Sequence, residues 1–227
     1  MYTRNNPSPK YLKQLNYYRE MHRQGYNRVI NGKPVYTSAN EAYPGNELGK
    51  YAQPIAELIK LTGAKSILDY GAGKGIGYEK SIEIEGIKYP NIQTYWKIDD
   101  ITRYEPALEN YNRLPENQFD GVVCTDVFPH IPIEDVIWVI EELFFYAKKF
   151  IFANIACYPA LAQLPNGENA HCTIEHPQWW AGIFHVLSHK YPQLKYLLGL
   201  VGSAMSAKGD ISNQLVWIGN LQIRPFP

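Results

Sequence analysis

The sequence predicts an α/β domain built on a mostly parallel sheet. Three runs of apolar, β-branched and aromatic residues, at 66–70, 119–125 and 150–155, have the length and composition of buried strands. Each run opens into a turn or a polar loop, and helical patterns lie between the runs and after them. The chain has 227 residues, of which 45% are hydrophobic, so we expect one domain with a sizeable core plus an appendage.

The appendage is expected at the N-terminus, over residues 1–45, ahead of a main domain over residues 46–227. An amphipathic helix is predicted from about Pro9 to Gln24, because aromatic and apolar residues recur there at helical spacing. This stripe consists of Tyr11, Leu15, Tyr18 and His22. The helix either packs on the edge of the domain or forms a lid over a ligand site.

The segment between this helix and the first strand is expected to contain a turn, a loop and a second helix. Asn31–Pro34 has the composition of a turn, and Tyr36–Gly45 that of a loop. Helical spacing returns at about Asn46–Leu61, where Pro54 either kinks the helix or marks its start.

A glycine-rich turn follows the first strand, in the stretch Ser66–Gly75. Glycines occupy alternate positions after Asp69, so we expect positive φ angles there, and a ligand lying on backbone that carries no side chains. The N–H groups at the start of the next helix are expected to point into the same space. A phosphate-binding loop does not fit, because Ile76 follows Gly75. A dinucleotide fingerprint does not fit either, because its third glycine position holds Ile76 or Tyr78.

A carboxylate is expected at the end of the second strand of the sheet. A helix is predicted over Tyr78–Glu85. A strand is expected to begin at Asp99 and Asp100, and Glu105 stands at the end of its run Ile101–Tyr104, directly before Pro106. Glu105 is the best candidate for accepting hydrogen bonds from both hydroxyls of a ribose, the alternative being a solvated surface acid. From Leu108 to Asn117 there is too little chain for another strand with its helices, so the third strand is expected to be missing or rudimentary.

The second half of the chain is expected to complete the sheet. Thr125 and Asp126 follow the strand at 119–125, and the carboxyl ends of parallel strands share one edge, so both should lie beside Gly71 and Gly73. The remaining expectations are a helix at Pro132–Lys148, a long substrate loop at Ala156–Pro177, a helix at Gln178–His189, and two antiparallel strands at Lys195–Val201 and Gln214–Ile218 joined through Lys208–Asp210.

Four motifs together resemble a bacterial and phage branch of the class I S-adenosylmethionine (SAM) dependent methyltransferases. They are Leu-Asp-Tyr-Gly-x-Gly-Lys-Gly, Tyr-Glu-Pro-Ala, Cys-x-Asp-Val-x-x-His-Ile-Pro, and Leu-Pro-Asn-Gly-x-Asn-Ala-His with the Trp-Trp helix behind it. The resemblance covers roughly residues 46–190 and implies a Rossmann-like sheet, SAM as cofactor and S-adenosylhomocysteine as product. The cofactor-binding residues that it implies are Asp69, Gly71, Ala72, Gly73, Glu105, Pro106, Thr125 and Asp126.

The chain also departs from related enzymes in ways that bear on catalysis. Ubiquinone-type O-methyltransferases hold a divalent metal with Glu-x-x-Glu-His, but here Pro129 takes the place of the second acid, so no metal is expected. His171, Cys172 and His176 fall short of a closed zinc set. The catalytic candidates are His171 as first choice of base, His130 as second, and Asp126, although each histidine is alternatively a hydrogen-bonded structural residue.

The expected acceptor is a small molecule or a glycan, methylated on oxygen or nitrogen. The absence of an Asn/Asp-Pro-Pro-Tyr motif disfavours amide and adenine N6 methylation. Lys+Arg and Asp+Glu are both 22, which makes a nucleic-acid or membrane partner unlikely. The open alternatives are a nucleic-acid methyltransferase and a non-catalytic SAM- or nucleotide-binding subunit. Three cysteines without a Cys-x-x-Cys pair, and an N-terminus without an apolar run, predict a cytoplasmic protein.

Overall fold

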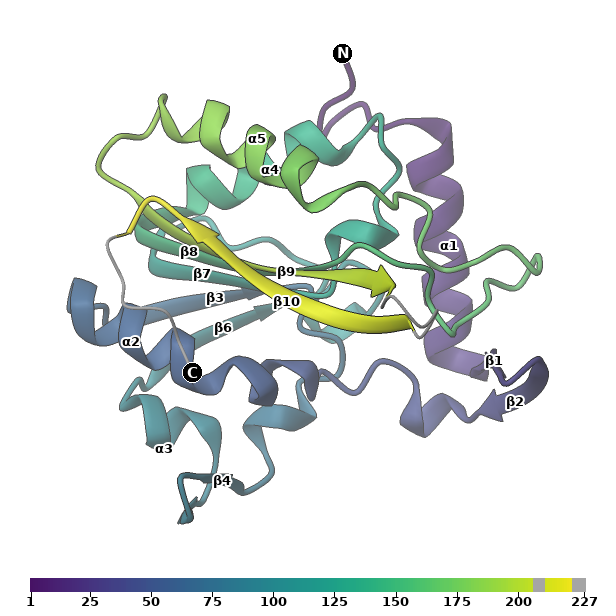
Figure 1. Ribbon diagram of the computed structural model, residues 1–227, viewed down its shortest axis with the longest axis horizontal. Helices are drawn as coiled ribbons and strands as arrows, with labels where there is room; N and C mark the ends of the chain where they lie inside the picture. Colours follow the sequence, from purple (N-terminus) through teal and green to yellow (C-terminus); the bar gives the residue numbers. More distant parts are fainter. Residues whose placement is uncertain (206–210, 222–227) are drawn as a thin grey trace.

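The computed structural model describes residues 1–205 and 211–221, and its centre is a six-stranded sheet (Figure 1). The strands lie in the order β10-β9-β8-β7-β3-β6. Their bounds are Ser66–Tyr70 (β3), Asp100–Tyr104 (β6), Phe119–Thr125 (β7), Ala147–Ala156 (β8), Lys195–Met205 (β9) and Ile211–Gly219 (β10). All neighbours pair in parallel except β9 and β10, which are antiparallel. The predicted fold class, including the antiparallel final pair, is therefore confirmed, while the predicted connection Lys208–Asp210 lies outside the described residues.

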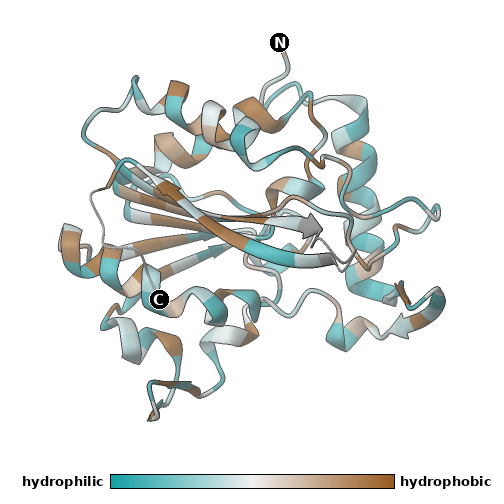
Figure 2. Cartoon of the chain, viewed as in Figure 1, coloured by the Kyte–Doolittle hydropathy of each residue, from teal (hydrophilic) through white to brown (hydrophobic). Residues whose placement is uncertain are grey.

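Helices cover both faces of this sheet, as parallel strands require. In Figure 1, α4 (Val136–Tyr146) and α5 (Pro177–Ser188) lie above the sheet, and α2 (Ala52–Thr62) and α3 (Ile92–Trp96) lie below it. The central strands are apolar along most of their length (Figure 2), and one buried cluster fills each side of the sheet. Trp180 on α5 is fully buried against Phe128 and Phe184, so it is a core residue.

The third strand is missing, as predicted. Between β6 and β7, the described residues form a single short 3-10 turn, Glu109–Tyr111, and no strand. As a result β6 is the edge of the sheet, and its last residues adjoin the glycine-rich turn rather than another strand.

The predicted helix over Tyr78–Glu85 is wrong. The chain forms a 3-10 turn at Ile76–Tyr78 and then a hairpin of β4 (Ile82–Ile84) and β5 (Ile87–Tyr89). Glu85 and Gly86 both have positive φ, 53° and 77°, as a two-residue hairpin turn requires. The alternation of Ile82 and Ile84 was the signal for this hairpin.

The N-terminal helix α1 (Pro9–Gln24) has the predicted bounds, and Ser8 caps it by accepting from the Tyr11 N–H. After α1 the chain forms a hairpin of β1 (Tyr26–Ile30) and β2 (Lys33–Thr37) across the predicted turn. The loop predicted from Tyr36 therefore begins two residues later. Short 3-10 turns at Ala39–Glu41 and Glu47–Tyr51 lead into α2, so the predicted second helix becomes fully α-helical only at Ala52.

The N-terminal extension packs directly on the sheet domain. Arg4 donates to Glu142 on α4 through Nε at 2.7 Å, and to the Tyr70 and Tyr104 hydroxyls at 2.7 and 3.0 Å. In Figure 1, α1 stands across the end of the sheet toward which the parallel strands point. No helix among the described residues is long and apolar enough to cross a lipid bilayer.

Candidate functional site

A cavity of about 960 Å³ lies between the carboxyl ends of β3, β6 and β7 and the N-terminal extension. Ligand sites typically occupy about 300–1,000 Å³, so this one is large enough for a cofactor together with a second small molecule. All of the site residues predicted from the sequence line it. They are Asp69, Gly71, Ala72, Gly73, Glu105, Pro106, Thr125, Asp126, His130 and His171.

The glycine-rich turn has the predicted positive φ angles, but the glycines are needed for packing within the protein and not for contact with a ligand. Gly71 and Gly73 adopt positive φ, 84° and 54°. A Cβ on Gly73 would lie 2.5 Å from the Tyr43 carbonyl oxygen, and one on Gly71 would lie 2.2 Å from a Val127 methyl group. The positions that side chains would take are thus filled by the protein itself, and glycine is required for this close packing rather than for ligand approach.

The N–H groups of this turn are also largely occupied within the protein. Gly71 and Ala72 donate to the Tyr104 carbonyl at 2.8 and 3.0 Å, and Lys74 donates to the Tyr43 carbonyl at 2.9 Å. The expectation that free N–H groups point toward a ligand is therefore wrong. The turn contributes a fixed shape, and side chains contribute the polar groups.

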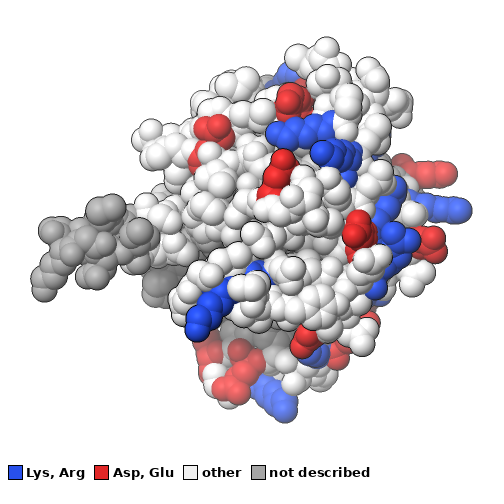
Figure 3. Space-filling model, turned by 90° about the vertical axis from the view of Figure 1, so that its right-hand side faces the viewer, with Lys and Arg blue, Asp and Glu red and all other residues white. Residues whose placement is uncertain are grey.

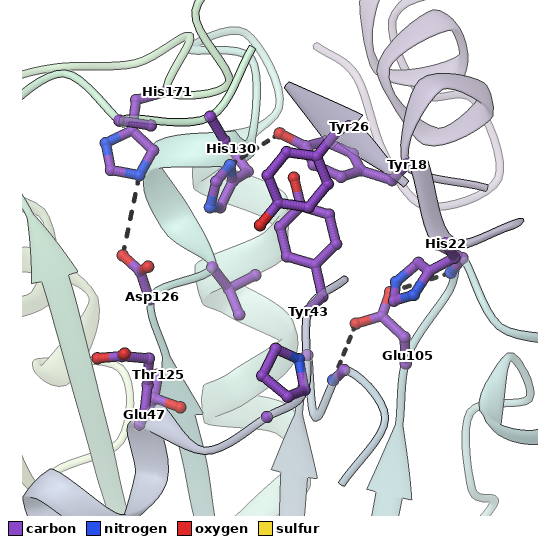
Figure 4. Close-up of a pocket in the computed structure, with 18 of the residues that line it drawn as sticks. Tyr18, His22, Tyr26, Tyr43, Glu47, Glu105, Thr125, Asp126, His130 and His171 are labelled. Carbon is purple, nitrogen blue, oxygen red and sulfur yellow. Dashed lines mark hydrogen bonds and ion pairs between the residues drawn. The ribbon is translucent and has the colours of Figure 1, made fainter. Parts of the chain in front are cut away.

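Glu105 projects from the end of β6 against this turn (Figure 4). Its Oε2 accepts from the Gly73 N–H at 3.2 Å, and its Oε1 accepts from the Ala107 N–H at 3.0 Å. Burial raises the pKa of this carboxyl, and the two backbone donors oppose that rise. Because each carboxylate oxygen has two lone pairs, Glu105 retains acceptor capacity for a ligand in the cavity that it lines.

Asp69 is the second carboxylate at this end of the cavity. It is 2% exposed, its Oδ2 accepts from the Tyr78 hydroxyl at 2.8 Å, and its Oδ1 is a buried atom with no hydrogen-bond partner in the part of the chain that the structure describes. Burial raises the pKa of Asp69 to about 7, the nearby Glu105 adds to the rise, and the Tyr78 hydrogen bond opposes it. A cationic ligand group bound nearby would favour the ionised carboxylate.

Asp126, His130 and His171 gather at the opposite side of the cavity (Figure 4). One ligand atom from each lies within 4.8 Å of the others. The two imidazole rings meet edge to face with centroids 4.7 Å apart. Burial, and next the neighbouring His171, lower the pKa of His130, so its imidazole is neutral at physiological pH. His176, in contrast, is exposed and caps α5, away from this cluster.

The N-terminal extension, for whose helix the sequence left open a position over a ligand site, supplies one wall of the cavity. Tyr26 stacks on Tyr43 with centroids 5.1 Å apart, and Tyr18 meets Tyr43 edge to face at 5.5 Å. Several buried polar atoms of extension residues in this wall have no hydrogen-bond partner among the described residues. They are Gln14 Oε1, His22 Nδ1, Arg28 Nε and Thr37 Oγ1. The count of 18 tyrosines and the stripe on α1 were the available signals.

Fold and cavity together define an α/β protein with a large cavity at the carboxyl edge of its parallel sheet, covered by an N-terminal helix. No protein-family model matches the chain, and no curated protein matches it. A solved chain described as "DhpI-SAH complex structure" is similar over 91% of this chain and 79% of that chain, at 12% identity and a TM-score of 0.30. An identity and a TM-score this low do not assign the chain to a family.

Proposed function

We propose that the protein is a SAM-dependent methyltransferase that acts on an oxygen or nitrogen of a small polar molecule or a glycan. The observation that carries the proposal is one cavity with two chemically different ends. The glycine-rich turn, Asp69 and Glu105 suit an adenosyl ligand with a cationic tail. Asp126, His130 and His171, at the other end, suit an acceptor that must lose a proton.

The proposed reaction is an in-line displacement. The acceptor atom forms a bond to the methyl carbon as the bond from that carbon to the SAM sulfur breaks, and S-adenosylhomocysteine leaves as a neutral thioether. His171 supplies the base in the simplest version. Its Nδ1 lies 2.6 Å from the Tyr158 carbonyl, which can only accept, so the proton sits on Nδ1 and Nε2 is free to take the acceptor's proton.

The acceptor is proposed to bind on the side of the cavity formed by the extension. The stacked tyrosine rings of that side suit the face of a sugar. A nucleic-acid acceptor finds less support, because Lys and Arg are interspersed with Asp and Glu on the face drawn in Figure 3.

Removing the Glu105 carboxylate is expected to weaken SAM binding. Glu105→Ala should cost about 1–3 kcal/mol, or roughly 5- to 150-fold in the dissociation constant, because the ribose hydroxyls lose a charged acceptor. Titration calorimetry measures the change. Glu109→Ala, which removes an exposed carboxylate from the following turn, is the matched control. An unchanged dissociation constant for Glu105→Ala would show that another acid binds the ribose.

SAM binding is also expected to weaken at acidic pH, by about tenfold between pH 8 and pH 6. With a pKa of about 7, Asp69 is mostly ionised at pH 8 and mostly protonated at pH 6. The cationic cofactor binds the ionised form, so affinity falls as pH drops through the pKa of the free protein. Calorimetry at both pH values tests this, and Asp69→Asn should bind weakly but equally at both. A wild-type affinity that does not change with pH would contradict the assignment.

The function itself is tested by calorimetric titration of SAM, followed by a screen of polar small molecules and glycans for release of S-adenosylhomocysteine. We expect one SAM bound per chain and turnover with a hydroxylated or aminated acceptor. Absence of SAM binding would contradict the proposal. Binding without turnover on any acceptor would leave a non-catalytic SAM-binding subunit in its place.

A further inference from the structure

We propose that Asp126, His130 and His171 form a binding site for a divalent transition-metal ion such as Zn²⁺, Co²⁺ or Mn²⁺. The proposal rests on how the protein fixes the two imidazoles and on what their free nitrogens face. It deepens the proposed function, since the ion would lie where the acceptor is activated, but binding of the ion does not itself depend on SAM.

His171 turns its Nε2 toward a carboxylate. Its Nδ1–H donates to the Tyr158 carbonyl at 2.6 Å, so a neutral ring has its lone pair on Nε2. That Nε2 lies 3.9 Å from Asp126 Oδ1, too far for a direct hydrogen bond. In the neutral ring two acceptor atoms face each other across this gap, and a cation between them would bind to both.

His130 is held in the same manner. Its Nδ1 lies 3.1 Å from the Ala170 carbonyl and 2.7 Å from the Tyr18 hydroxyl, which itself lies 3.0 Å from that carbonyl. The carbonyl can only accept, which favours the proton on Nδ1 and leaves Nε2 unprotonated. Metal-binding histidines typically donate their other N–H to a carbonyl or carboxylate in this way, because that bond fixes both the ring and the tautomer.

Asp126 completes the set from a strained backbone position. Its φ is 56°, which costs energy for a residue with a side chain and is typical of functional sites. Its side chain is 35% exposed, whereas that of His171 is 4% exposed, so the three groups form a pocket with one side open to the cavity. Pro129 occupies the position of the second acid in the Glu-x-x-Glu-His motif. In this protein His171, from the long loop, supplies the third ligand instead.

The donor set selects the kind of ion. Two imidazoles and one carboxylate suit zinc, cobalt, manganese or iron, whereas magnesium and calcium prefer oxygen ligands alone. Ligand atoms within 4.8 Å of one another need to close by about 1 Å or slightly more to reach bonds of about 2.1 Å. Three protein ligands leave a coordination position for an acceptor oxygen. An ion held there would lower the pKa of a bound acceptor hydroxyl and so favour its deprotonation before methyl transfer.

The test is a titration of the chelator-treated protein with Co²⁺, followed by visible absorption and calorimetry. His185 and His189 are exposed, one helical turn apart, with ring centroids 4.7 Å apart, so they offer a second place for an ion. All proteins therefore carry His185→Ala and His189→Ala. In this background we expect one saturable Co²⁺ site per chain, which Zn²⁺ displaces.

His171→Ala and Asp126→Asn, each in that background, should weaken Co²⁺ binding by at least about 100-fold. This is more than the usual cost of removing an outer partner, meaning a residue that hydrogen-bonds to a metal ligand but does not contact the metal. Asp126→Asn preserves the shape of a partly exposed side chain, so this variant is expected to fold even if His171→Ala does not. Tyr18→Phe, which removes only an outer partner of His130, should cost about 10-fold.

Two outcomes would overturn the proposal. One is the absence of saturable Co²⁺ binding in the background protein. NMR at pH 7 would then be expected to show a protonated His171 imidazole, paired with Asp126 in place of the metal. The other is Co²⁺ binding that both ligand variants retain. A parallel SAM titration separates this result from the proposed function, because SAM binding without metal binding would contradict the metal site alone.

Discussion

His171→Ala should lower kcat by about 10²- to 10⁴-fold, the range for loss of a positioned acid or base, while the dissociation constant for SAM changes little. Both versions of the mechanism use the same atom. As a base, Nε2 takes the acceptor's proton, and as a metal ligand it holds the ion that makes the proton leave. The side chain is 4% exposed, and its Nδ1 lies 2.6 Å from the Tyr158 carbonyl, which directs Nε2 toward Asp126.

The measurement is a single-turnover assay of methyl transfer together with a SAM titration of the same protein. His189→Ala is the matched control, because that histidine is exposed at the end of α5 and does not line the cavity. It should retain wild-type rates. Equal rates for wild type and His171→Ala would remove His171 from the chemistry and leave His130 as the base to test.

Gly73→Val should abolish measurable SAM binding, a loss of more than about 100-fold, and lower the melting temperature. The turn at Gly73 lies against the Tyr43 carbonyl, where an added Cβ would be 2.5 Å from the oxygen, and its φ of 54° disfavours a branched side chain. Relief of that clash moves Gly73 away from Glu105, to which its N–H donates. The floor of the cavity and its carboxylate are then displaced together.

Thermal unfolding and SAM titration at a temperature where the variant is folded measure the two effects separately. Gly182→Val is the control, since its added Cβ meets nothing within 4 Å and Gly182 is exposed on α5. If Gly73→Val does not fold, Gly73→Ala adds only the first side-chain atom and should show the same order of effects. A folded Gly73 variant with wild-type affinity would contradict the role assigned to the turn.

The sequence predicted the sheet and the positions of its ligand-facing ends because those depend on local pattern plus one geometric rule. The runs at 66–70, 119–125 and 150–155 have the apolar, β-branched and aromatic composition of buried strands, whatever their surroundings. Parallel strands place their carboxyl ends at one edge of the sheet. Asp69, Glu105 and Asp126 could therefore be expected around one space before any coordinates.

What the sequence missed depends on contacts between distant segments. Nothing local to Tyr43 indicates that its carbonyl fills the space beside Gly73, and that contact changes the reason why glycine is needed there. The approach of His171 to His130 is likewise a product of the long loop, whose path is fixed by bonds to Pro129 and Ala162 carbonyls rather than by a motif. The hairpin at Ile82–Tyr89 was missed because three-residue strands carry too little periodicity to outweigh a helical reading.

The most direct test is a crystal structure of the protein with S-adenosylhomocysteine. The account predicts that the ligand lies in the cavity with both ribose hydroxyls within hydrogen-bond distance of Glu105, its amino group near Asp69, and its sulfur directed toward the space beside Asp126 and His171. A ligand bound elsewhere, or a ribose without contact to Glu105, would contradict it.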